Sequence, residues 1–230
     1  MTSPTYEPDT LSALLGDTDI DVRLQAVELF RTLRSPEDCA RAALIAAGLD
    51  EVEPMRAVLE RLWPGVHNAP RRTQMLRGFA VDCAVHTLPA LAVYQQRPWH
   101  GFAGRMPDLS LVGDALQAAR VADRAAMVSL HDRLQVPVSA CRRWSRAAAT
   151  RGGPERLLRR ALEALRAVRH TCILDPLDAA HHACWSAQRA AASPLAEIDW
   201  QRGWFVERLL GAAPLPLPPL LRQPASSVPS

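Results

Sequence analysis

The stretch Glu155-Arg-Leu-Leu-Arg-Arg-Ala-Leu-Glu-Ala-Leu-Arg-Ala-Val-Arg169 decides the fold class of this chain. Its apolar side chains recur every three or four residues and fall on one arc of a helical wheel, whereas the arginines and Glu163 fall on the opposite arc. Gly152-Gly153-Pro154 comes directly before it and marks a helix start. The segment therefore predicts an amphipathic helix. Its apolar arc consists of Leu157, Leu158, Ala161, Leu162, Leu165 and Val168.

The same helical period continues on both sides of this segment. Asp175-Pro176-Leu177-Asp178 supplies an N-cap, a proline at the first helical position and an acid at the third, so a helix should run from there to about Ala192. Ser193-Pro194 starts a last helix that ends near Gly211. Alternation typical of strands is nearly absent, which predicts an all-α protein. The other helices are expected over about 20–33, 36–47, 54–62, 71–88, 111–134 and 137–150, with Pro89 kinking or ending the helix over 71–88.

The composition bounds the class of protein but does not name a function. The chain has 230 residues, of which 48% are hydrophobic and 22% charged, which excludes a membrane protein and a wholly disordered one. All 27 basic residues are arginines, a bias typical of GC-rich coding genomes, so arginine here need not mean phosphate binding. No run approaches the roughly 20 apolar residues that cross a bilayer, and we expect a cytoplasmic protein. The five cysteines show no CxxC spacing, which favours reduced, buried thiols.

The amino-terminal part contains an acid-rich turn between two helical segments. Leu14-Leu15-Gly16 is followed by the turn Asp17-Thr18-Asp19-Ile20-Asp21 and by Val22-Arg23-Leu24-Gln25-Ala26-Val27. This order of a short helix, a capping turn and a Val-Arg-x-x-Ala helix start resembles a HEAT-type repeat. Only this one unit is clear, so we expect a short layer of helical hairpins over residues 1–66 and not a long solenoid. A second helical domain over 67–211 and a disordered, proline-rich tail over 212–230 complete the predicted organisation.

The second domain contains several short motifs spread along its length. They are Asp82-Cys83-Ala84-Val85-His86-Thr87-Leu88-Pro89, Pro107-Asp108, Asp114-Ala115-Leu116-Gln117-Ala118-Ala119-Arg120, the alanine-rich stretch 179–192 and Glu197-Ile198-Asp199-Trp200-Gln201. In these residues the domain resembles the all-helical immunity proteins that bacteria encode beside polymorphic toxins. The resemblance implies a small helical protein that binds and neutralises a toxin and performs no chemistry of its own. It therefore implies a toxin protein as the partner.

Charge is distributed unevenly along the chain. Residues 1–60 hold twelve acids and five arginines, a net charge of −7, whereas residues 142–169 hold nine arginines and two acids, a net charge of +7. Arginines on successive helical turns can follow phosphates, which makes a HEAT-like adaptor that binds protein or nucleic acid through 142–169 the alternative function. Only Trp144 interleaves as an aromatic, so a solvated or interdomain face is favoured over nucleic acid.

Histidines and cysteines near the second half of the chain resemble zinc ligands at first sight. His181, His182 and Cys184 share one predicted helix, with His170 and Cys172 before it. On the wheel, however, His182 lies about 160 degrees from Cys184, which falls among alanines. The pattern favours a core cysteine beside a surface histidine pair, and we expect neither a metal nor another cofactor.

The candidate partner-binding residues come from two places. Asp82 and His86 stand four apart on the predicted helix over 71–88, where the carboxylate can orient the imidazole. Trp99 and Phe102 lie in the glycine- and proline-rich segment 97–110, which either covers the core or meets a partner. The next candidates are the turn acids Asp17, Asp19 and Asp21, which would attract a basic toxin surface.

No motif of an enzyme accompanies these residues. The sequence lacks GxSxG, a P-loop, the dinucleotide-binding glycine pattern and HExxH. Cys83 lies between Asp82 and His86, but it falls in the middle of an apolar stripe, where a thiol stays inert unless its pKa is lowered. We therefore predict no catalytic residue and a protein that is not an enzyme.

Overall fold

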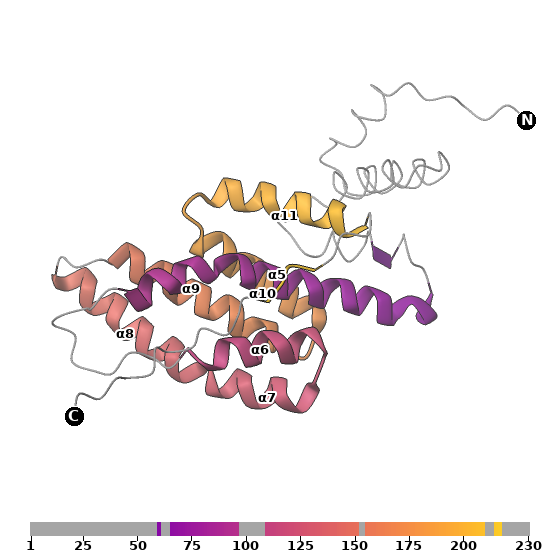
Figure 1. Cartoon of the computed structure of the whole chain (residues 1–230), viewed down its shortest axis with the longest axis horizontal. Coiled ribbons are helices and arrows are strands. Elements are labelled where there is room, and N and C mark those ends of the chain that lie inside the picture. Colours follow the sequence, from indigo (N-terminus) through magenta and orange to yellow (C-terminus); the bar gives the residue numbers. More distant parts are fainter. Residues whose placement is uncertain (1–58, 61–64, 97–108, 152–154, 210–213, 218–230) are drawn as a thin grey trace, which may run out of the picture. The chain divides into compact units, whose positions relative to one another are not determined.

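The computed structural model describes residues 59–60, 65–96, 109–151, 155–209 and 214–217. Within these ranges every regular element is a helix and no strand occurs, so the prediction of an all-α protein is confirmed. Figure 1 shows the elements, which are η1 (Val66–Asn68), α5 (Ala69–Gln96), α6 (Leu111–Arg120), α7 (Arg124–Arg133), α8 (Gln135–Arg151), α9 (Glu155–Thr171), α10 (Pro176–Ala190) and α11 (Pro194–Leu209).

The chain divides into two compact units, one of residues 1–73 with 198–213 and the other of residues 74–197 with 214–230. Nearly all of the first unit's predicted HEAT-like layer lies outside the described residues. In the part of that unit that is described, Trp204 is buried, and the Arg208 guanidinium lies 5.6 Å from the centre of its ring. None of the described helices is long and apolar enough to cross a membrane.

Helix α9 is the centre of the second unit, because it contacts α6, α7, α8 and α10. The stretch that predicted an amphipathic helix therefore has neighbours on several sides. Even Glu163, expected on the outer arc, is only 7% exposed. Arg156 and Arg159 of the expected polar arc are exposed, whereas Glu163 is covered because a central helix buries more than one arc. Its buried residues are Leu158, Ala161, Leu162, Glu163, Ala164, Leu165, Ala167, Val168 and Thr171.

Two predicted helix boundaries differ from the structure. Helix α5 does not end at Pro89 but continues to Gln96. The single helix expected over 111–134 is two helices, since α6 closes at Ala122, whose φ is 55°. There the amides of Ala122 and Asp123 donate to the carbonyls of Ala119 and Ala118, the Schellman arrangement that usually uses glycine. Asp123 then caps α7 by accepting from the Ala126 amide at 3.1 Å.

The predicted start of α10 is confirmed. Asp175 is its N-cap, and its carboxylate accepts from the amides of Leu177 and Asp178 at 2.8 and 2.9 Å. Pro176 occupies the first helical position, where its missing N–H costs nothing. The helix ends at Ala190, close to the predicted Ala192, and Ser193 accepts from the Ala196 amide at the start of α11.

Arg77 of α5 binds the carboxyl end of α9. Its guanidinium donates to the carbonyl of Thr171 at 3.3 Å, to that of Ile173 at 2.5 Å and to that of Leu174. The last carbonyls of a helix have no partner within the helix and attract a cation. Arg77 is itself only 7% exposed, and burial lowers the pKa of its guanidinium. We call this arrangement the carbonyl clasp.

Candidate binding surfaces

Asp82 is at the centre of a second buried contact, which joins α5, α6 and the tail. Its side chain is fully buried, and its Oδ1 lies 3.0 Å from Arg120 Nη2. Leu215 of the tail donates its amide to Asp82 Oδ2 at 3.3 Å and accepts from Arg120 at 2.7 Å. Asp82 therefore does not offer its carboxylate at the surface. It has a structural role, and it holds the four described tail residues, 214–217, against the second unit.

His86 takes a different partner from Asp82. Its Nδ1 donates to Oε2 of Glu197 at 2.6 Å, and its side chain is 41% exposed while that of Glu197 is 4% exposed. The carboxylate that orients this imidazole thus comes from α11, although the sequence pointed to Asp82, four residues earlier. The structure places the two candidate residues in separate contacts, one buried and one at the surface.

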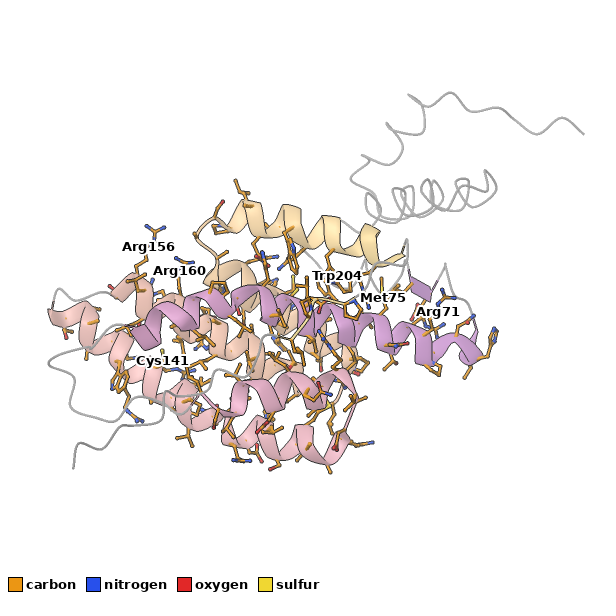
Figure 2. All side chains as sticks on the ribbon, in the orientation of Figure 1. Arg71, Met75, Cys141, Arg156, Arg160 and Trp204 are labelled. Atoms are coloured by element: carbon orange, nitrogen blue, oxygen red, sulfur yellow. The ribbon has the colours of Figure 1, made fainter. Side chains whose placement is uncertain are left out.

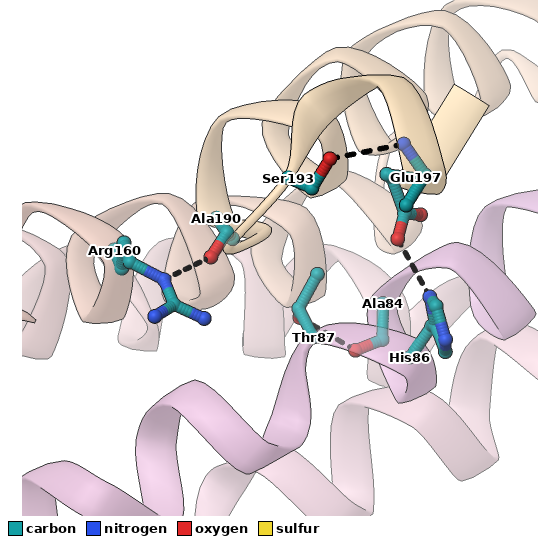
Figure 3. Close-up of polar contacts among 8 residues, drawn as sticks. Ala84, His86, Thr87, Arg160, Ala190, Ser193 and Glu197 are labelled. Carbon is teal, nitrogen blue, oxygen red and sulfur yellow. Dashed lines mark hydrogen bonds and ion pairs between the residues drawn. The ribbon is translucent and has the colours of Figure 1, made fainter.

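The His86–Glu197 pair borders a cavity of about 280 Å³ in the second unit. Side chains of α5, α9, α10 and the start of α11 line it, and half of the lining residues are alanines. Figure 3 shows Arg160 at one end, the His86–Glu197 pair at the other, and Thr87 and Ser193 between them. Nothing in the sequence pointed to this cavity, because its walls come from four segments that meet only in the folded chain.

Cys83 is fully buried in α5. Burial raises the pKa of its thiol well above the ordinary value, and the nearby Cys184, Glu197 and Asp82 raise it further. A thiol with a raised pKa holds its proton and is a poor nucleophile at neutral pH. These surroundings are those of a core cysteine, and Cys141, Cys172 and Cys184 are buried as well.

The histidines that resembled zinc ligands are engaged with other groups. Nδ1 of His170 lies 3.1 Å from the carbonyl oxygen of His182 and 3.2 Å from the Ser186 hydroxyl. Cys184 is buried, as predicted, and the amide of Gln188 lies 3.4 Å from its sulfur. Across the ranges that the structure describes, no three His, Cys, Asp or Glu side chains gather as a metal site requires.

An aromatic and cationic surface runs along the exposed side of α10. The rings of His181 and Trp185 stack with centroids 5.5 Å apart and planes inclined by 24°. One turn later the Arg189 guanidinium lies 5.2 Å from the centre of the Trp185 ring. His182 touches His181 edge-on, with ring centroids 5.4 Å apart. We call His181, His182, Trp185 and Arg189 the α10 strip. Its i, i+4, i+8 spacing is visible in the sequence, where we singled out only the histidine pair.

The arginines of 142–169 divide into two groups. Four of them bind other groups of the protein, because Arg159 donates to Glu155, Arg160 to the Ala190 carbonyl, Arg166 to Glu163 and Arg169 to the His131 carbonyl. Others are exposed, among them Arg142, Arg143 and Arg146 on α8 and Arg156 on α9. The arginine run is therefore not one continuous charged face.

The remaining candidates, Trp99, Phe102, Asp17, Asp19 and Asp21, lie outside the described residues. No family model matches this chain, and neither curated proteins nor solved structures give a match. Its function is therefore argued from its own side chains.

Proposed function

We propose that this protein is a non-enzymatic binding module, and that it acts as an immunity protein which binds and neutralises a cognate bacterial toxin. The observation that carries the binding role is the stack of His181, Trp185 and Arg189. Trp185 is 46% exposed, yet the His181 imidazole stacks on its ring and the Arg189 guanidinium lies over it. The toxin as partner follows from the resemblance of the second domain to immunity proteins.

The stack favours a protein partner for energetic reasons. Tryptophan and arginine are enriched among the interface residues whose truncation costs most binding free energy. A ring that already contacts His181 and Arg189 has less rotamer freedom to lose when it is covered by a partner, which lowers the entropic cost of binding.

The charge of the α10 strip indicates the kind of surface that it binds. Arg189 carries a permanent positive charge and lies over the Trp185 ring. An acidic patch on the toxin, with an apolar centre that covers Trp185, is complementary to these groups.

The test measures binding and protection with the toxin domain encoded beside this gene. Trp185→Ala should weaken binding about 30-fold, equivalent to about 2 kcal/mol, and abolish the growth rescue that the unchanged protein gives when coexpressed with the toxin. Val136→Ala, which removes an exposed apolar side chain of α8, is the matched control and should leave both unchanged.

Two outcomes would contradict the proposal. Full affinity of Trp185→Ala for the toxin would remove the α10 strip from the interface. The second outcome is submicromolar binding of DNA or RNA near 0.15 M salt that is lost when Arg142, Arg143 and Arg146 are replaced by alanine. It would favour the adaptor function, because salt weakens phosphate contacts steeply and only a specific interface keeps such affinity at this salt concentration.

A further inference from the structure

The cavity beside His86 and Glu197 has the form of a small binding site. Its volume of about 280 Å³ is just below the range of about 300–1,000 Å³ that holds drug-sized ligands, so its occupant must be small. Half of the lining residues are alanines, on α5, α10, α11 and the connection between α10 and α11. Their methyl groups favour an aliphatic group in the cavity.

Arg160 supplies the charged end of this cavity. Its Nε donates to the Ala190 carbonyl at 2.6 Å, which fixes the plane of the guanidinium. Its two Nη nitrogens make no hydrogen bond to any residue that the structure describes, although the side chain lines the cavity. A guanidinium held through Nε presents its Nη donors as a fork, the geometry that matches a carboxylate.

Two hydroxyl groups between the ends add directional contacts. Ser193 Oγ accepts from the Ala196 amide at 3.3 Å, so its own proton remains available to a ligand. Thr87 Oγ1 donates to the Ala84 carbonyl at 2.7 Å and can still accept. At the far end, the carboxylate of Glu197 accepts a hydrogen bond from His86. Because this carboxylate already has a donor, the ligand does not need a positively charged group to satisfy it.

We propose that this cavity binds a small carboxylate with a short aliphatic chain, with the carboxylate on Arg160 and the chain against the alanine walls. The carboxylate can belong to a free short-chain acid or to the carboxyl terminus of a peptide. This site is separate from the α10 strip, and the proposal does not rest on toxin binding.

The test is a titration of the full chain, followed by NMR at the backbone amides of residues 190–197. The probe 4-methylpentanoate should give saturable shifts, whereas the neutral 4-methylpentanamide should bind at least about tenfold more weakly because it lacks the charge. A tripeptide that ends in leucine with a free carboxyl group tests the peptide source, and the same tripeptide with an amidated carboxyl group is its control. Whichever binds more tightly, the short-chain acid or the free tripeptide, identifies the source of the carboxylate.

The variants locate the site. Arg160→Gln should weaken binding of the carboxylate at least about tenfold. Arg156→Gln removes the same charge one turn earlier on α9, from a side chain that Figure 2 shows extending away from the ribbons, and should leave binding unchanged. If Arg160→Gln unfolds, Ala196→Leu, at an exposed position of the wall, should block the cavity and weaken binding to a similar degree.

Several results would overturn the proposal. The first is that neither the acid nor the peptide gives saturable shifts. The second is equal affinity for the acid and the amide, and the third is that folded Arg160→Gln binds the carboxylate as tightly as the unchanged protein. Equal affinity for inorganic phosphate would also contradict it, because phosphate has no aliphatic part for the alanine walls.

Discussion

Arg77 and Arg189 are the same residue type in opposite settings. Arg77 is 7% exposed and donates to carbonyls at the carboxyl end of α9, whereas Arg189 belongs to the exposed α10 strip and lies over the Trp185 ring. The first arrangement satisfies backbone groups that would otherwise be buried without a partner, and the second leaves its side chains open to a partner. In a chain whose only strong cation is arginine, composition cannot tell these two roles apart, but burial can.

The largest expected difference between the two regions is in stability. Arg77→Ala should lower the free energy of unfolding by about 3 kcal/mol, because it leaves the carbonyls of Thr171, Ile173 and Leu174 without their donor. Urea unfolding followed by circular dichroism measures this. The exposed Arg124 provides the control, since Arg124→Ala should change stability by less than about 0.5 kcal/mol. Similar values for both variants would mean that the carbonyl clasp does not stabilise the fold.

A smaller loss is expected at the second buried contact. Asp82→Asn keeps the shape of the side chain but removes the charge that faces Arg120, and should cost about 2 kcal/mol. Part of the effect should appear as faster proteolysis near residue 215, because the Leu215 amide loses a charged acceptor. Asp114→Asn, at an exposed position of α6, should alter neither stability nor proteolysis. If Asp82→Asn has the stability of the unchanged protein and the same rate of proteolysis near residue 215, the charge of Asp82 does not stabilise the fold.

His170 precedes Thr171 of the carbonyl clasp, and its Nδ1 lies 3.1 Å from the carbonyl oxygen of His182 in the α10 strip. It should make the free energy of unfolding depend on pH. Burial lowers its pKa from 6.5 to about 4, and the hydrogen bond to the His182 carbonyl offsets only part of this. The folded protein therefore favours the neutral ring, so its contribution is complete above pH 6.5 and is lost as the pH falls from 6.5 towards 4. The expected loss is about 2 kcal/mol, because the ring is partly exposed.

Unfolding free energies at pH 7.5, 6, 5 and 4.5 test this expectation. His170→Gln removes the titrating group, and its stability should fall less between pH 6.5 and 4 than that of the unchanged protein. A pH profile identical to that of the unchanged protein would assign the acid sensitivity to other groups, such as His131, whose pKa is also lowered by burial.

The smallest stability effect is expected in the α10 strip. Trp185→Ala and Arg189→Ala should each change the free energy of unfolding by less than about 0.5 kcal/mol, since they remove exposed side chains. Thermal melting measures this change. A nearly unchanged melting temperature combined with lost toxin binding would show that the α10 strip contributes to binding and not to stability. A large drop in the melting temperature would instead assign Trp185 to the support of the fold.

The features that sequence reasoning could reach are local ones. Asp175 caps α10 as predicted, because an N-cap involves residues two and three positions apart. The end of α6 was missed because alanine at position 122 takes a backbone conformation that the sequence would assign to glycine. Helix α5 continues past Pro89, although a proline inside a helix removes a backbone donor.

The candidate site depended on contacts that no local pattern contains. His86 pairs with Glu197, which is 111 residues away in the sequence, and Asp82 with Arg120, which is 38 residues away. The spacing of four residues in the sequence instead suggested that the Asp82 carboxylate orients the His86 imidazole. The cavity likewise requires α5, α9 and the α10–α11 connection to meet.

The hydrogen bond between the Leu215 amide and Asp82 forms late in the synthesis of the chain. The two residues are 133 positions apart, whereas Arg120 follows Asp82 by 38. At about 5–20 residues per second, the ribosome adds Leu215 about 7–27 s after Asp82, and Arg120 within about 2–8 s. Both partners of the ion pair are therefore synthesised before the residue whose amide donates to the same carboxylate.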